Sequence, residues 1–272
     1  MTKPILPPKS NTVFQLLFGD QRNVELLADF LKAVLDIPED EYRDIRIVNP
    51  YLPREYVDKK LGIVDLRITT RSGQIIHVEI QRFPFTAMRD RIVFYDSSLI
   101  AGQIGEKEEF KALKRVITIL ITNYPLFPKS PPYHHRFTLY DHRAAVEFTD
   151  LLEIRTLELP KIPETPDVYL WHWLRFFSAE TKEELDMAAN ASPAIQKATA
   201  KVLKLSKDER ARLIHEYEVR AWRDEMARLD DAVTGERIAI ARNLLKRNMA
   251  VADIADITGL SHDEIEKLRI IF

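Results

Sequence analysis

Hydrophobic residues recur at helical spacing in the first part of the chain. Between residues 11 and 36, apolar side chains return every three or four positions, which predicts a helix. The dipeptide Gly19-Asp20 interrupts this stretch and predicts a break into two pieces. The apolar positions on the expected buried face are Val13, Phe14, Leu17, Phe18, Leu26, Leu27, Phe30, Leu31 and Val34.

Strand patterns dominate the next part of the chain. Residues 115–122 are apolar at both alternations, which is typical of a central strand buried on both faces. A helix is predicted ahead of it, from about Thr86 to Gly105, with Thr86 as its N-cap. The strands expected before residue 166 lie at residues 44–48, 63–70, 75–83, 115–122, 136–140 and 151–159.

This order of elements predicts the fold class. A helix, a strand pair, a second helix and a buried strand form an α/β arrangement around a mixed sheet. From Pro166 onward the patterns are helical, and the last three are short and lie between Gly235 and Phe272. We therefore expect an α/β domain at residues 1–165, a helical extension at residues 166–232, and a small helix-turn-helix-like module at residues 233–272.

The predicted strand pair at residues 63–70 and 75–83 has two different faces. Even positions are aliphatic and odd positions are polar, and side chains alternate along a strand. Burying the aliphatic residues together requires even positions to pair with even positions, which a connection of three or five residues allows. We expect Asp65 opposite Gln81, with Glu79 diagonally adjacent and both carboxylates on one exposed face.

Two carboxylates at this range favour a metal ion. They repel each other unless a cation lies between them. Their hard oxygen atoms favour Mg²⁺ or Mn²⁺, and such an ion can polarise a phosphoryl oxygen and lower the pKa of a water molecule. The alternative is a solvated polar face on which Asp, Glu, Arg and His offset one another.

Composition excludes several other classes of protein. The chain has no cysteine, which excludes disulfides, thiolate zinc sites and a cysteine nucleophile. Its longest apolar run, residues 116–122, is far shorter than the roughly 18–20 residues of a membrane helix. The N-terminus lacks the apolar core of a signal peptide, so we expect a cytoplasmic protein without a membrane span. The net charge of −2 means that any nucleic acid would have to meet a local basic patch.

The strand pair also resembles a known nuclease signature. Asp65, the turn and the run Glu79-Ile80-Gln81 resemble the D…(D/E)-x-K signature of PD-(D/E)xK nucleases, with glutamine in place of lysine. The flanking sequence is similar to the recombination-promoting nuclease family, whose members are also described as transposases. The similar stretches cover most of the chain and lie at residues 14–35, 58–81, 91–103, 117–127, 157–161 and 240–268.

The resemblance implies a fold, a reaction and a set of roles. It implies an αβββαβ, restriction-endonuclease-like core that cleaves double-stranded DNA with Mg²⁺, or with Mn²⁺ or Ca²⁺ in its place. Asp65 and Glu79 would be metal ligands, with the Ile80 carbonyl as a third. Gln81 would occupy the lysine position and orient the attacking water or a phosphate oxygen, since an amide cannot act as a base. The general base stays unassigned, and a metal-bound hydroxide is the preferred candidate.

Several residues near the strand pair are candidates for contact with DNA. Arg91 and Tyr95 lie one helical turn apart and are expected to face the scissile phosphate. The alternative for Arg91 is an ordinary ion pair with Asp90 or Asp96. The further candidates for contact with the DNA backbone are Arg82, Arg89, Lys59 and Lys60, for which a solvated loop is the alternative at both lysines.

Histidines and aromatic residues have simpler interpretations. His77 shares the face of Glu79 and is expected to be a neighbour there, with proton transfer or metal binding as the alternative. His134 and His135 are expected to be a surface pair in a proline-rich loop. Trp171, Trp173, Phe176 and Phe177 are expected to pack in the core.

The resulting hypothesis is a metal-dependent DNA endonuclease of low sequence specificity, acting in recombination or mobile elements. Cutting both strands requires a homodimer or two encounters. Asn11 and Gln15 stand where family members often carry an acidic residue and a lysine. With Gln81, they motivate the alternative of a non-catalytic DNA-binding or protein-interaction module. A toxin-like ribonuclease on the same fold is a third hypothesis.

The last part of the chain has a different character. Gly259 lies between two short helical patterns, which resembles the turn of a helix-turn-helix. Residues 235–272 carry six acidic and six basic residues, and this balance does not suit a DNA reader. We expect these helices to mediate dimerisation or to bind a protein partner.

Overall fold

The computed structural model describes residues 4–48, 66–105 and 107–270. The chain divides into two compact units, Met1–His215 and Glu216–Phe272. The domain boundaries expected after residues 165 and 232 stay predictions.

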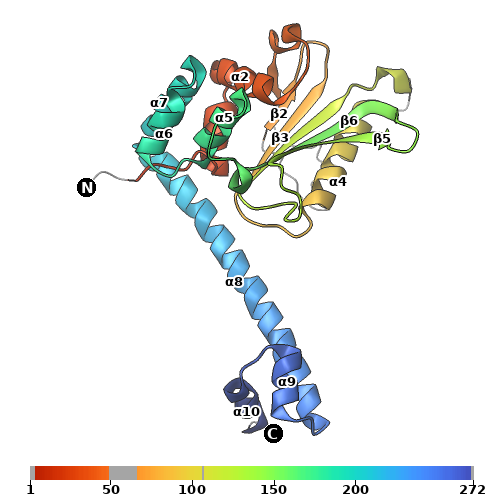
Figure 1. Ribbon diagram of the computed structural model, residues 1–272, viewed down its shortest axis with the longest axis vertical. Helices are drawn as coiled ribbons and strands as arrows, with labels where there is room; N and C mark the ends of the chain where they lie inside the picture. Colours follow the sequence, from red (N-terminus) through yellow and green to blue (C-terminus); the bar gives the residue numbers. More distant parts are fainter. Residues whose placement is uncertain (1–3, 49–65, 106, 271–272) are drawn as a thin grey trace. The chain divides into compact units, whose positions relative to one another are not determined.

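The described part of the first unit contains one mixed sheet of six strands, in the order β1-β2-β3-β4-β6-β5 (Figure 1). β3 and β4 are parallel, as are β4 and β6, and the other neighbours are antiparallel. This confirms the expected α/β class with a mixed sheet. The strands are β1 Arg46–Val48, β2 Leu66–Thr69, β3 Ile75–Gln81, β4 Val116–Thr122, β5 His134–Asp141 and β6 Val146–Glu158.

The hairpin of β2 and β3 has the odd-numbered connection that the sequence predicts. Five residues separate the paired Thr69 and Ile75, and Gly73 adopts a positive φ of 89° in the turn. Even positions pair with even positions, so the aliphatic residues share one face. The register differs from the expected one, because Leu66 pairs with Val78 rather than Ile80. The expected pairing of Asp65 with Gln81 falls on a residue outside the described part of the chain.

One face of the sheet packs against helices from both ends of the first unit. The even positions of β3 and the odd positions of β4 enter one core with these helices. Within it, the rings of Phe18, Phe30, Trp173 and Phe177 lie 5.2–6.2 Å apart. The expected aromatic core is confirmed for Trp173, Phe176 and Phe177, whereas Trp171 is half-buried and lies outside it. The helices are α1 Asn11–Phe18, η1 Gln21–Asn23, α2 Val24–Val34, α5 Tyr169–Ser178, α6 Lys182–Ala189 and α7 Pro193–Leu205. The break between α1 and α2 confirms the interruption expected at Gly19-Asp20.

The opposite face is covered by α4 (Met88–Ala101). Met88 and Ile92 pack on Leu120 of β4, and the next turns of the helix reach Ile75 and Val116 through Tyr95 and Leu99. The expected N-cap Thr86 is wrong, because Ala87 holds that position and makes no side-chain cap. Besides η1, the described residues form the 3₁₀ helices η2 Glu39–Tyr42, η3 Phe110–Ala112 and η4 Leu159–Lys161.

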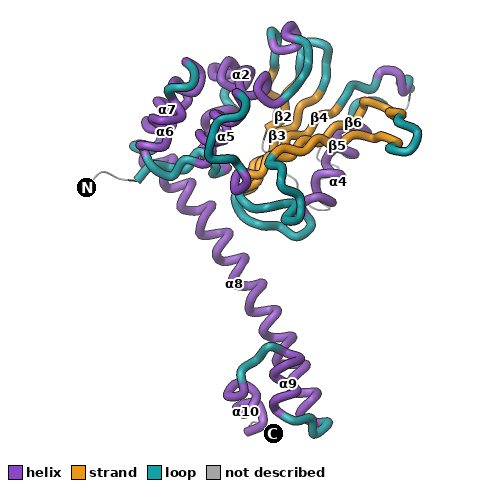
Figure 2. The backbone as a smooth tube through the Cα atoms, viewed as in Figure 1, coloured by secondary structure: helices purple, strands orange, loops and turns teal. Residues whose placement is uncertain are grey.

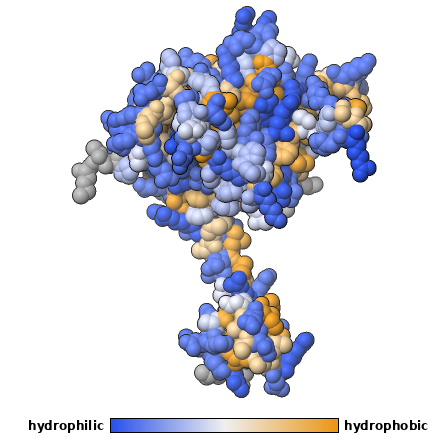
Figure 3. All heavy atoms as spheres, viewed as in Figure 1, coloured by the Kyte–Doolittle hydropathy of each residue, from blue (hydrophilic) through white to orange (hydrophobic). Residues whose placement is uncertain are grey.

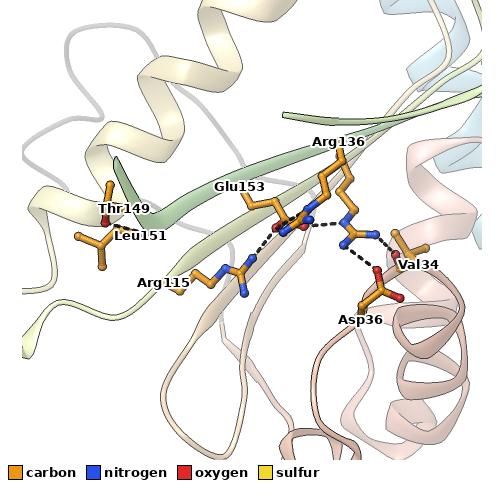
Figure 4. A network of polar contacts seen from close by, with 8 residues as sticks. Val34, Asp36, Arg115, Arg136, Thr149, Leu151 and Glu153 are labelled. Carbon is orange, nitrogen blue, oxygen red and sulfur yellow. Dashed lines mark hydrogen bonds and ion pairs between the residues drawn. The ribbon is translucent and has the colours of Figure 1, made fainter. Parts of the chain in front are cut away.

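A buried ionic cluster joins β6 to the end of α2 (Figure 4). The carboxylate of Glu153, only 1% exposed, receives three guanidinium groups. Arg155 also donates to the Val34 carbonyl at 2.5 Å and pairs with Asp36 at 3.2 Å. The three arginines around Glu153 are Arg115, Arg136 and Arg155.

The second unit contains most of α8 (Glu209–Lys246), together with α9 (Val251–Thr258) and α10 (His262–Ile270), as Figure 2 shows. The helical character expected from residue 166 is confirmed. The first of the three short patterns expected after Gly235 is wrong as a separate helix. α8 continues through Gly235, since one glycine costs a helix about 1 kcal/mol and does not by itself end it.

A small apolar core holds the second unit together. The residues of this core are Ala241, Ile254, Leu260, Ile265 and Leu268. Gly259 ends α9 with a positive φ of 69°, which lets the chain turn into α10.

Among the described helices of the whole chain, none combines the length and apolar character needed to cross a membrane. The face of the first unit drawn in Figure 3 is largely hydrophilic, with separate hydrophobic patches.

Candidate active site

Glu79 lies at the centre of the candidate site. It belongs to β3, the third strand of the sheet, and its side chain is completely buried. Arg91 of α4 places Nη2 at 2.5 Å from Oε1 of Glu79, and Gln81 donates from Nε2 to the same oxygen at 2.9 Å. The structure therefore brings together three of the residues predicted from the sequence.

His77 holds the other oxygen of Glu79. Its Nε2 lies 3.4 Å from Oε2 of Glu79, and its Nδ1 lies 3.1 Å from Oγ1 of Thr118 and 3.6 Å from Asp96. The Thr118 hydroxyl in turn donates to Asp96. These contacts form a buried polar chain from Glu79 through His77 and Thr118 to Asp96. Sequence reasoning missed Thr118, whose partners come from a different strand and a helix.

The surroundings of His77 change its protonation. Burial by itself lowers the pKa of His77, but the hydrogen bonds and charges of Asp96 and Glu79 raise it to about 9. His77 is therefore a cation at neutral pH that lies between two carboxylates. Its role as a neighbour of Glu79 agrees with the expectation from the sequence.

The expected exposure of this face is wrong. His77 and Glu79 are both completely buried, because α4 crosses the sheet and covers the polar side of β3. The alternative partners expected for Arg91, Asp90 and Asp96, are also not the ones observed. Arg91 pairs with Glu79, while Asp96 contacts Thr118 and His77.

Two aromatic rings flank Arg91. Its guanidinium lies 5.2 Å from the Tyr95 ring and 5.7 Å from the Phe85 ring, within the range of cation–π attraction. Tyr95 is 4% exposed and its ring centroid lies 6.1 Å from that of His77. Arg91 remains 28% exposed, so the pair extends from the buried carboxylate to the surface of α4.

Arg82 follows the site residues directly in sequence. Its guanidinium lies 5.0 Å from the Phe83 ring. Its Nη1 is buried and makes no hydrogen bond with the described residues. A buried guanidinium nitrogen without a partner suits an anionic oxygen, because burial without compensation is costly. Arg89, in contrast, is exposed on α4 near the Phe127 ring.

The other residues singled out in the sequence lie in several different parts of the chain. Ile80 turns its side chain into the core on the opposite face, which leaves its carbonyl as the candidate ligand. Asn11 and Gln15 are half-buried on α1. Asp65, Lys59 and Lys60 lie outside the described residues. The surface loop expected around His134 and His135 is wrong, because both are half-buried residues of β5 and His135 contacts Ser130 at 2.8 Å.

Among the described residues, Glu79 is the candidate metal ligand. Glu79 offers hard carboxylate oxygens, which suit a divalent ion of the magnesium type. Within residues 4–48, 66–105 and 107–270, no three His, Asp or Glu side chains converge as metal ligands. The residues fit such an ion in chemistry, and a second carboxylate would complete the set.

A mixed sheet with an αβββαβ order and an acidic residue on its second hairpin strand defines the PD-(D/E)xK class of nuclease-like folds. A family model described as "PD-(D/E)XK nuclease family transposase" matches residues 8–232, and the chain belongs to this family. This confirms the resemblance and supports a nuclease- or transposase-related role with DNA as substrate. Searches of curated proteins and of solved structures returned no match.

Proposed function

We propose that the protein is a metal-dependent DNA endonuclease of low sequence specificity, linked to recombination or mobile elements. The observation that carries this proposal is the buried Glu79 carboxylate, with the amide of Gln81 and the guanidinium of Arg91 on one oxygen. Burying a charged carboxylate costs free energy, and such groups are concentrated at functional sites. At the centre of a nuclease-family sheet, the function of this carboxylate would be to bind a cation next to a phosphodiester.

Asp65, Glu79 and the Ile80 carbonyl would hold the ion, with Mg²⁺ preferred and Mn²⁺ or Ca²⁺ as alternatives. When bound, the ion supplies Lewis-acid polarisation of a phosphate oxygen. His77 contacts Oε2 of Glu79, whereas Gln81 and Arg91 hold Oε1, so the carboxylate is fixed at both oxygens. A positioned carboxylate needs little reorganisation when ligands arrive.

Gln81 and Arg91 act on the substrate side of this carboxylate. Arg91 holds Oε1 of Glu79, the oxygen that would be a metal ligand, and its guanidinium is partly exposed at the surface. A guanidinium pairs well with phosphate, so Arg91 would bind the scissile phosphate. The Gln81 amide would orient the attacking water or a phosphate oxygen. The Tyr95 ring packs against the guanidinium of Arg91 and supports it. Arg82 and Lys59 would contact the DNA backbone.

The second candidate function is a non-catalytic DNA-binding module. The ion pair between Arg91 and Glu79 favours this second function, because Arg91 already supplies the positive charge that a metal would bring to Glu79. Gln81 in place of lysine, together with Asn11 and Gln15, points the same way. Homodimerisation, a protein partner for the C-terminal helices and a cytoplasmic location stay predictions.

The test is cleavage of supercoiled plasmid in Mg²⁺, Mn²⁺ or EDTA. The wild-type protein is compared with Asp65→Asn and Glu79→Gln, which keep side-chain volume and remove charge. We expect nicking or linearisation in the metal buffers and a loss of at least about 100-fold in each folded variant, since each removes a charged ligand.

Three other outcomes contradict this proposal. Intact plasmid in every metal, with DNA still shifted in a gel, supports the non-catalytic module. Cleavage that survives in both variants means that the site lies elsewhere. Cleavage of RNA with intact plasmid indicates a ribonuclease.

A further inference from the structure

A groove lined by cations lies between η1 and α7 in the first unit. Its volume is 650 Å³. Arg22 comes from η1, whereas three lysines come from α7 and the turn that follows it. Lys201 donates from Nζ to Oδ1 of Asn23 at 2.5 Å, which joins the two walls. We call this surface the lysine groove and define it by Arg22, Lys201, Lys204 and Lys207.

The charge around the lysine groove differs from that of the whole chain. Residues 193–212 contain six basic and two acidic residues, a net charge of +4, although the whole protein carries −2. The acidic residues of the groove are Asp20, which pairs with Arg22, and Asp208, which accepts a hydrogen bond from the Ala211 amide. Lys204 and Lys207 are exposed and form no ion pair with a residue that the structure describes. The first unit therefore has a local basic patch, although the net charge of the whole chain is negative.

The helix α1 runs from the lysine groove to an ion pair just before its N-terminus. Leu16 of α1 lines the groove, and Lys9, just before α1, pairs with Glu180 at 2.9 Å. α1 therefore connects the lysine groove with the Lys9–Glu180 pair, and its eight residues span about 12 Å.

We propose that the lysine groove binds the phosphate backbone of the DNA duplex on which the protein acts. Lys201 and Lys204 lie about 4.5 Å apart along α7, similar to the rise of about 3.4 Å between phosphates along one strand. Leu16 and Leu205 are the apolar residues of the lining, whereas four of its nine residues are cationic. The inference rests on the proposed function in one respect, since it takes DNA as the substrate.

Phosphate contacts have a measurable signature in the salt dependence of binding. Each phosphate that a cation neutralises releases counterions, so the slope of log Kobs against log salt changes by about 0.9 per contact. The triple variant Lys201→Gln/Lys204→Gln/Lys207→Gln should lower this slope by about 2–3. It should also weaken binding at least tenfold near 100 mM salt.

The experiment measures fluorescence anisotropy of a labelled 30-base-pair duplex across a KCl series in EDTA, so that no cleavage occurs. The matched control is Lys107→Gln/Lys111→Gln/Lys129→Gln, which removes the same charge from exposed lysines of the same unit. The control should keep the wild-type slope and affinity. A thermal melt establishes that both variants fold, and two single variants, Lys204→Gln and Lys207→Gln, replace the triple variant if it does not.

The outcomes separate this inference from the proposed function. If the wild-type protein binds duplex and the triple variant keeps its slope, the groove is not a DNA surface, whatever the plasmid assay shows. Equal losses in the groove variant and the control also overturn the inference, because a general charge effect explains them. Wild-type protein that neither binds nor cuts DNA contradicts the proposed function itself. Lysine-dependent binding to anionic lipid vesicles, with unchanged DNA binding, would reassign the groove to a membrane surface.

Discussion

Arg91 and Glu79 form an ion pair of 2.5 Å between a surface helix and the centre of the sheet. The carboxylate is completely buried and the guanidinium is 28% exposed. The arginine is therefore the side of the pair that can exchange with solvent, metal or phosphate. This relationship connects the stability of the protein with the chemistry of its site.

Replacing Arg91 by glutamine should destabilise the protein in EDTA. The change removes one of the two cations that contact Glu79, the other being His77, and breaking a buried pair costs about 3–5 kcal/mol, which the partial exposure of Arg91 reduces to about 2 kcal/mol. Urea denaturation measures the loss. Added Mg²⁺ should stabilise the variant more than the wild type, since the ion then replaces the missing charge. Arg89→Gln, on the exposed side of α4, should change little, and equal stability of both variants would contradict the role of the pair.

Stability should fall as the pH rises from neutral to about 9. The pKa of His77 is raised from 6.5 to about 9 in the folded protein, because the hydrogen bonds to Asp96 and Glu79 outweigh the effect of burial. The contribution is fully present below pH 6.5 and is lost as the pH rises through 9. Urea titrations between pH 6 and 10 measure it. His77→Asn should flatten this part of the profile, whereas exposed His142→Asn should leave it unchanged.

Glu153→Gln should be strongly destabilising. The substitution removes the charge that compensates Arg115, Arg136 and Arg155, and a broken buried pair costs on the order of 3 kcal/mol. Burial by itself raises the pKa of Glu153, but the guanidinium groups hold it below its ordinary value. Its contribution is thus present above pH 4.5 and is lost as the pH falls through the lowered pKa. Denaturation at pH 7 and pH 3 checks both statements, with exposed Glu147→Gln on the same strand as control.

Two glycines of the C-terminal helices should respond in opposite directions to alanine. Gly235 lies inside α8 with open space where a Cβ would stand, so Gly235→Ala should stabilise the helix by about 0.5–1 kcal/mol. Gly259 has a φ of 69°, so Gly259→Ala should destabilise by about 1 kcal/mol. Thermal unfolding followed by circular dichroism measures both. Destabilisation by Gly235→Ala would mean that α8 breaks at this residue.

Local patterns predicted much of the fold because they depend on near neighbours in the chain. The alternation in residues 63–70 and 75–83 predicted the even-with-even pairing and the odd-numbered turn of β2 and β3. The apolar run at residues 115–122 predicted the fully buried β4. Spacing and similarity to a family also selected Glu79, Gln81 and Arg91 as a group, and these three side chains meet in the structure.

The long C-terminal helix shows a limit of local patterns. Gly235 suggested a boundary, but α8 continues through it to Lys246. The cost of one glycine in a helix is about 1 kcal/mol, which the rest of a long helix can offset. A single residue therefore predicts a boundary poorly when the segments on both sides favour the same structure.

The sequence by itself determined the α/β class, the order of elements, the pairing parity of the hairpin and the choice of Glu79 as the central carboxylate. Tertiary structure alone decided which register β2 takes, that α4 buries His77 and Glu79, and that Arg91 pairs with Glu79 rather than Asp90 or Asp96. It also decided that Arg22 lies beside Lys201, far away in the sequence. The physical reason is that alternation and spacing are local properties, whereas burial and charge pairing depend on which distant segments pack together.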